Sequence, residues 1–424
     1  MAGFRSPLDA YRQDLARAQG RNRLASDDEY WIILATGLRR LAQAPQRERP
    51  DAARRLSEVL ISFAEEIERT RQVSGDAPTH DEPPTGRPPA VADALRRFPE
   101  ADFATTLVTE VRGAVADAEE AGALLLAREM LTDLVTLAAH APPLDRGYVF
   151  LQLGRIARTL GDLDAAHDLY HAAGALGRTT GTQELVVREA LSQAILARTR
   201  GNHPSARELF QAAADGAAAL GLIDVSGLAN HGLMIEMAEA GNFDLALAYG
   251  WQALSAARAQ QAREAEMLIN LAQLCADAGY DAAALGGFVA ALSRASAPRL
   301  RLPALGGTVT SASRLRDRDR VAAAERAIAA AENDAFPFES ARAWLSVARA
   351  RRLLGDAAMA DAAAERAAAI ARAHGFHEIT HHATERPAAE PASLSHRSLD
   401  VIRSLETWSD DSSLDAVLSS APTD

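Results

Sequence analysis

A glycine turn recurs along this chain at an almost constant spacing, which limits the fold to a few architectures. Four segments, 157–173, 197–213, 237–253 and 275–291, align without gaps, and their central glycines are 40, 40 and 38 residues apart. The same spacing extends back to Gly122 and forward to Gly355, with the intervening turn expected at Asp317. Seven units at a spacing of 38–40 residues predict a fold built from repeated supersecondary units.

Each unit has the pattern of two helices joined at the glycine. Glycine ends a helix without steric cost because it adopts the left-handed conformation. An acid or asparagine then follows that can cap the next helix; these residues are Asp162, Asn202, Asn242 and Asp281. Five residues after the glycine comes an alanine, where a larger side chain would hold the paired helices apart: Ala127, Ala166, Ala206, Ala246, Ala284 and Ala360. The pattern predicts an all-α fold of stacked helix pairs.

These residues resemble the tetratricopeptide repeat (TPR). The resemblance is carried by Leu153-Gly154, Ala157, Gly161, Ala166, Tyr170 and Ala173 in one unit, and by Trp344 at the start of the last. It covers 103–374, and its units are longer than the usual 34 residues, as in bacterial sensor and regulator relatives. It implies a right-handed α-solenoid of about seven TPR-like helix pairs. It further implies a concave peptide-binding face lined by the first helices, and no catalysis.

Composition divides the chain into four parts. Residues 1–72 are predicted to form an N-terminal helical segment, and 73–90, which are rich in proline, a flexible linker. The TPR-like solenoid is expected over 91–374. Residues 375–424 are expected to be a mostly disordered tail with a short amphipathic helix at about 396–408. The N-terminal helices are either an output module or a cap of the solenoid.

Composition and charge exclude several functions. All 45 basic residues are arginine, so no lysine is present for a Schiff base or a phosphate-binding loop. The net charge of −12 argues against nucleic acid or an anionic membrane as the partner. The one cysteine, Cys275, is expected to be a buried structural thiol. We expect a cytoplasmic bacterial protein without a cofactor.

The first helices supply the candidate binding residues. Positions three and six residues before each turn glycine lie on the same helix face, and neighbouring positions extend this face. The candidates are Tyr148, Gln152, Arg155, Arg158, Arg188, Arg198, His231, Asn270, Gln273, Arg349 and Arg352. They predict a groove that is basic at both ends, suited to a protein or an acidic peptide because arginine makes bidentate contacts with carboxylates. The alternative is a solvated, arginine-rich helix face.

Three other features of the sequence suggest possible sites. His377, Glu378 and His381 match the H-E-x-x-H pattern of zinc hydrolases but follow the last repeat, without a clear helical context or a third ligand. A run of arginines over 294–320 could contact phosphates, but Asp317 and Asp319 interleave it and no aromatic residues accompany it. Its Arg-Asp-Arg-Asp stretch is therefore expected to be a charged loop between helices, paired with acids of a neighbouring unit. The acidic, amphipathic tail suggests a further hypothesis, docking in cis in the basic groove.

The favoured function is therefore a non-enzymatic scaffold or adaptor that binds protein or peptide on the concave face of the repeat. One alternative is a ligand- or peptide-responsive regulator that signals through the N-terminal helices. The other is a metal-dependent hydrolase that uses His377, Glu378 and His381, which ranks last because the motif is short and lacks its structural context.

Overall fold

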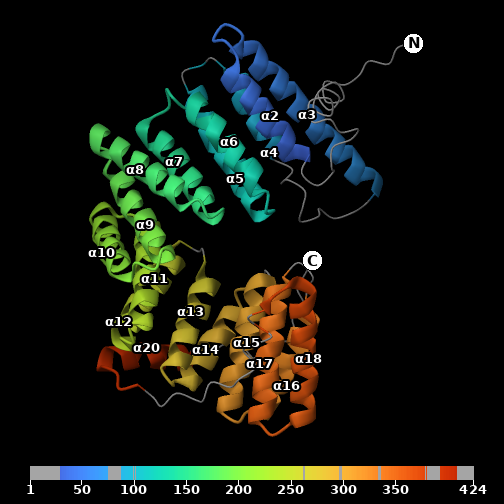
Figure 1. The fold of residues 1–424 in the computed structure, drawn as a ribbon, viewed down its shortest axis with the longest axis vertical. Helices are drawn as coiled ribbons and strands as arrows, with labels where there is room; N and C mark the ends of the chain where they lie inside the picture. The colour runs from blue at the N-terminus through green and yellow to red at the C-terminus, as the bar shows by residue number, and fades with distance from the viewer. Residues whose placement is uncertain are drawn as a thin grey trace. The chain divides into compact units, whose positions relative to one another are not determined.

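A computed structural model of the protein describes residues 29–74, 87–98, 100, 102–260, 263–295, 298–332, 336–377, 379 and 392–407. These residues form 18 α-helices and contain no strand (Figure 1). The all-α prediction is confirmed. The chain divides into two compact units, Met1–Asn202 and His203–Asp424.

The first unit contains eight described helices, of which α2–α7 share one apolar core. They are α2 (Glu29–Gln43), α3 (Arg49–Ser74), α4 (Arg87–Arg96), α5 (Phe103–Glu120), α6 (Leu124–Leu137), α7 (Pro143–Thr159), α8 (Leu163–Thr180) and α9 (Gln183–Thr199). Trp31 of α2, Leu60 of α3, Leu95 of α4 and Leu131 of α6 are buried in one cluster that extends into α7. The N-terminal helices therefore share a core with the first repeats.

The predicted linker lies between α3 and α4. Residues 75–86 are outside the described residues, whereas 73–74 complete α3 and 87–90 begin α4. Pro88 and Pro89 fall in the first turn of α4, where proline is tolerated because the first amide groups of a helix have no partner within it. Both described ends of the predicted linker, 73–74 and 87–90, are thus helical.

The second unit contains ten described helices. They are α10 (His203–Leu220), α11 (Ile223–Glu239), α12 (Phe243–Ala259), α13 (Glu264–Asp277), α14 (Asp281–Leu292), α15 (Pro298–Arg314), α16 (Arg318–Ala331), α17 (Pro337–Leu353), α18 (Ala357–His374) and α20 (His396–Thr407). Consecutive helices pack as pairs, among them α11 with α12 and α17 with α18. A continuous apolar cluster runs from Met234 through Phe288 and Trp344 to Leu405.

The turn geometry follows the predicted spacing. All six predicted turn glycines have positive φ: Gly122, Gly161, Gly201, Gly241, Gly279 and Gly355. Asp162 and Asn242 cap the following helices by accepting hydrogen bonds from the amides of Ala165 and Leu245. The six alanines five residues after the glycines are fully buried, as tight helix contacts at this position require.

Two turn predictions were wrong in detail. The left-handed residue before α16 is Arg316 (φ 62°), and Asp317 instead caps α16 by accepting from the amide of Arg320. Asp281 is the first residue of α14 and does not cap it; its carboxylate lies 3.1 Å from Nη1 of Arg314. Asp281 thus forms an ion pair with the next helix pair, and its side chain does not cap α14.

The tail helix α20 packs on α12 and α14 (Figure 1). Its Val401, Ile402 and Leu405 are buried in the core of the second unit. The prediction that the tail docks in the groove of first helices is therefore wrong for α20, because α12 and α14 are the second helices of their pairs. The acidic end of the tail, which includes Asp410 and Asp411, lies outside the described residues.

Candidate functional site

The first helices of unit 1 bring several predicted residues together around Tyr148 of α7. The Tyr148 ring lies between two guanidinium groups, with Cζ of Arg112 and of Arg188 at 4.6 and 5.1 Å from the ring centroid. Its hydroxyl donates a hydrogen bond to Glu184, which also accepts from Nε of Arg188 at 2.8 Å. Cations placed over an aromatic face are attracted by the ring quadrupole. Helices α5, α7 and α9 thus meet at this tyrosine.

Gln152 continues the same network one turn further along α7. Its Oε1 accepts from Nε of Arg112 at 3.1 Å, and its Nε2 donates to Oε1 of Glu119 at 3.2 Å. The same Glu119 oxygen accepts from Nη2 of Arg155 at 2.8 Å. Burial lowers the pKa of Arg112, so this guanidinium has lost part of its hydration. We name this network, formed by Arg112, Glu119, Tyr148, Gln152, Arg155, Glu184 and Arg188, the α5–α7–α9 face.

The network contains three residues that were not among the sequence candidates. Arg112 and Glu119 belong to the first helix of the first repeat, and Glu184 lies one turn before Arg188. The position rule applied to the Gly122 unit gives Glu119 directly, because it lies three residues before the glycine, and Arg112 belongs to the neighbouring positions that extend the same helix. Their presence changes the predicted electrostatics, because carboxylates accompany the arginines of this face.

Arg158 and Arg198 lie outside this network. Burial raises the pKa of Tyr170 on α8, and the guanidinium of Arg158 beside its hydroxyl partly offsets this rise. Arg158 therefore belongs to the packing between α7 and α8. Arg198 is half-buried in the last turn of α9.

The five candidates in unit 2 form no single cluster of comparable size. Nδ2 of Asn270 lies 3.0 Å from Nε2 of His231, which joins α13 to α11. Gln273 donates to Asp277 of its own helix at 3.0 Å. Arg349 is half-buried and Arg352 exposed on α17, with Nη2 of Arg352 3.3 Å from Oδ1 of Asp361. The predicted basic end of the groove is thus partly neutralised here as well.

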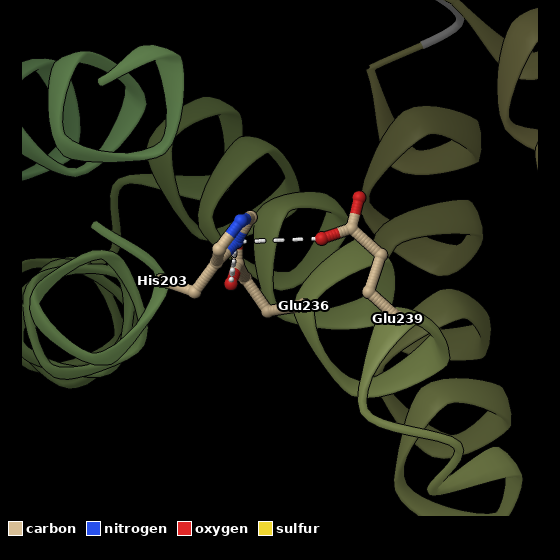
Figure 2. A group of neighbouring side chains, drawn as sticks. All are labelled: His203, Glu236 and Glu239. Carbon is tan, nitrogen blue, oxygen red and sulfur yellow. Dashed lines mark hydrogen bonds and ion pairs between the residues drawn. The ribbon is translucent and has the colours of Figure 1, made fainter. Parts of the chain in front are cut away.

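A histidine–carboxylate cluster that the sequence analysis missed lies in unit 2 (Figure 2). His203 begins α10, and Glu236 and Glu239 stand in the last turn of α11. Nδ1 of His203 is 3.1 Å from Oε2 of Glu236 and 3.4 Å from Oε2 of Glu239. The sequence repeat could have indicated this cluster. His203 lies two residues after Gly201 and Glu239 lies two residues before Gly241, and stacked repeats bring successive turns close together.

The remaining sequence candidates have clear outcomes. Glu378 and His381 lie outside the described residues, so the H-E-x-x-H site stays a prediction. Cys275 is fully buried, and burial raises the pKa of its thiol to about 12. In the arginine-rich segment, Arg314 pairs with Asp281 and Arg318 with Asp356, at 3.1 and 2.9 Å. The predicted pairing with acids of a neighbouring unit is confirmed, but the loop is shorter than predicted, because Arg318 and Asp319 already belong to α16.

Comparison with known proteins supports the fold. No protein-family model and no curated protein sequence matches this chain. Similar solved structures include BtubC from P. vanneervenii (13% identity, 72% of this chain and 95% of that chain, TM-score 0.35). A Rap protein complexed with competence and sporulation factor is also similar (10% identity, 82% and 99%, TM-score 0.46).

A third similar structure is a signal-transduction ATPase with a tetratricopeptide-repeat sensor from Pyrococcus horikoshii. It is 13% identical over 80% of this chain and 54% of that chain, with a TM-score of 0.50. At this identity the similarity concerns the fold alone, and it supports a TPR-like helical repeat. Among the described residues, no helix is long and apolar enough to cross a membrane.

Proposed function

We propose that this chain is a non-enzymatic protein-interaction scaffold that binds a protein segment or peptide on the α5–α7–α9 face. The observation that carries this proposal is the convergence of three successive first helices on Tyr148, with a guanidinium contributed by each of them. Stacked repeats place equivalent positions of successive helices side by side, which suits an extended ligand.

The partner group best suited to this face is a carboxylate. Each guanidinium has five N–H donors, and the hydrogen bond from Arg155 to Glu119 uses one of them, at Nη2. Arg155 is 51% exposed, so it is accessible to an incoming ligand. Arg112 is half-buried and partly desolvated, and a charge-assisted hydrogen bond is stronger at such a position. An acidic peptide or a carboxylate terminus is therefore the proposed ligand class.

The packing of the N-terminal helices supports a scaffold over a regulator with a separate output module. Helices α2 and α3 are buried in the same apolar cluster as α4–α7, and α2 contacts α6. An element that shares a core with the repeat caps its exposed end, as terminal repeats of solenoids require. We propose this capping role for α2 and α3, and an adaptor function in the bacterial cytoplasm for the whole chain.

Fluorescence polarisation with labelled peptides tests the proposed function. Two synthetic peptides of equal length are compared, one acidic with a free carboxyl terminus, the other with amides in place of every carboxylate. We expect the acidic peptide to bind and the amide peptide to bind at least about tenfold more weakly, because a hydrogen bond to a charged group contributes about 1.5–3 kcal/mol.

Variants of the full chain locate the site. Arg155→Met and Arg188→Met should each weaken binding of the acidic peptide by about tenfold or more. Arg200→Met is the matched control, because Arg200 also pairs with an acid, Asp164 at 2.7 Å, but lies at the C-cap of α9 outside the network. Equal binding of both peptides, or equal losses in all three variants, contradicts the proposal.

A further inference from the structure

We propose that His203, Glu236 and Glu239 form a binding site for one divalent first-row metal ion of the Zn²⁺ class. This site is separate from the α5–α7–α9 face and belongs to unit 2, so the proposal does not depend on the proposed function. The three side chains come from the first residue of α10 and the last turn of α11 (Figure 2).

The positions of the donor atoms suit a single metal ion. One ligand atom from each residue lies within 4.8 Å of the others, and the two histidine–carboxylate distances are 3.1 and 3.4 Å. Tetrahedral coordination with bonds of about 2.0–2.2 Å places neighbouring donor atoms about 3.4 Å apart. Small side-chain rotations therefore suffice to bring the three donors around one ion.

The state of Glu236 is an independent reason to expect a cation. Its side chain is fully buried, and its Oε1 has no hydrogen-bond partner within the described part of the chain. A buried carboxylate oxygen without a partner is unfavourable because its lost hydration is not replaced. A divalent ion held between Glu236 and His203 compensates for that loss.

The C-terminal end of α11 adds to the negative potential at this point. Glu236 and Glu239 both stand in the last turn of α11, where the helix dipole is negative and acids are unfavourable. A metal ion held by these two carboxylates and by Nδ1 of His203 supplies the positive charge that stabilises them.

Exposure and donor type indicate the kind of ion. The His203 side chain is 44% exposed and that of Glu239 54%, so an ion can enter from solvent and water can complete its coordination. One imidazole and two carboxylates are typical ligands for zinc and its neighbours. Magnesium and calcium prefer sites made of oxygen alone.

A second histidine–glutamate pair in unit 1 provides a matched control. Nδ1 of His171 is 3.3 Å from Oε1 of Glu189, but Oε2 of Glu189 already accepts a hydrogen bond from Nη1 of Arg178. The guanidinium there provides the compensating positive charge. The His171 pair should therefore not retain zinc, although its histidine has the same kind of partner.

Zinc uptake by the full chain tests the proposal. The protein is stripped with a chelator and titrated with Zn²⁺ against a chromophoric competitor at pH 7.5. We expect His203→Asn and Glu236→Gln each to bind one equivalent fewer than the unsubstituted chain, and His171→Asn to match it. Comparing variants subtracts zinc held by histidines elsewhere, such as His377 and His381. Thermal unfolding without metal checks that each variant is folded.

Two results would overturn the proposal. One is that the unsubstituted chain and His203→Asn bind the same number of zinc ions. The other is that His171→Asn loses as much zinc as His203→Asn, which would show that exposed histidines in general hold the metal. A loss of zinc in His203→Asn with unchanged peptide binding would also show that the two proposed sites are independent.

Discussion

The backbone carbonyl of Leu405 in α20 occupies the space that a Cβ atom would need on Gly286 of α14. This close approach lets α20 pack directly against α14, with Leu405 fully buried. The absence of a side chain at Gly286 is thus a packing requirement, although helix propensity alone would favour alanine there by about 1 kcal/mol.

Gly286→Ala should detach α20 from the second unit. The added methyl group meets a backbone oxygen, which cannot move away as the end of a flexible side chain can. Hydrogen exchange of the amides over 396–407 should become faster. Gly306→Ala on α15 is the matched control, because its Cβ would have its nearest neighbour at 3.4 Å, Oγ of Ser346. Unchanged exchange in Gly286→Ala would contradict this account of the contact.

Docking of α20 should also depend on pH through Asp244 of α12. Its Oδ1 accepts hydrogen bonds from the amide of Ser395 at 2.8 Å and the hydroxyl of Ser398 at 2.6 Å. These bonds lower the pKa of Asp244, Ser398 having the largest effect. The contribution to docking is therefore complete above the unfolded pKa of about 3.9 and is lost as pH falls through the lower folded value.

Exchange of the α20 amides, corrected for the intrinsic effect of pH, measures this dependence. Docking should be constant from neutral pH to about pH 5 and should weaken only below about pH 4. Asp244→Asn should dock more weakly at neutral pH and lack the acid step. An acid step of the same size in Asp244→Asn would show that another group is responsible.

Two adjacent arginines of α17 should differ sharply in their contribution to stability. Arg351 is 8% exposed, and its Nε lies 2.9 Å from Oε2 of Glu325, whereas its neighbour Arg352 is exposed. Arg351→Met leaves the Glu325 carboxylate without its main partner and should destabilise unit 2 by about 3 kcal/mol. Arg352→Met should cost less than about 1 kcal/mol.

Denaturant unfolding followed by circular dichroism compares the two arginine variants. The double variant Arg351→Met/Glu325→Met should recover part of the loss, because Glu325 is then no longer an uncompensated charge. Asp356, the other partner of Arg351, keeps its ion pair with Arg318. Equal shifts in the unfolding midpoint for Arg351→Met and Arg352→Met would contradict the predicted difference in stability.

Cys275 should resist thiol reagents in the folded protein. Its side chain is fully buried, and burial raises its pKa to about 12, so the reactive thiolate is scarce at pH 8. Labelling with a colourless disulfide reagent that releases a coloured thiol should be slow in buffer and rapid in denaturant. Rapid labelling under native conditions would instead indicate an accessible, redox-active thiol.

The helical architecture was predictable because its determinants are local. Gly161 and Gly241 mark turns at any position in space, and Asp162 and Asn242 cap the helices that begin beside them. The left-handed Arg316 was not predictable, because a non-glycine residue with positive φ is stabilised only by surrounding structure. Most of the fold prediction therefore rested on the period of the repeat.

The composition of the candidate sites was less predictable because it depends on which helices meet. The sequence identified Tyr148, Gln152, Arg155 and Arg188 but not the carboxylates that pair with the arginines. It likewise missed His203 and Glu236, which are 33 residues apart and meet only because α10 and α11 are antiparallel. Contacts across helices determine the charge of each site.

Hydrogen exchange of the full chain with and without the acidic peptide tests the central claim most directly, because it locates the ligand. If the α5–α7–α9 face is the binding site, bound peptide should slow exchange over α5, α7 and α9, and Arg188→Met should reduce this protection at the same peptide concentration. Protection confined to the second helices α8 and α12, or retained in full in Arg188→Met, would contradict the proposed site.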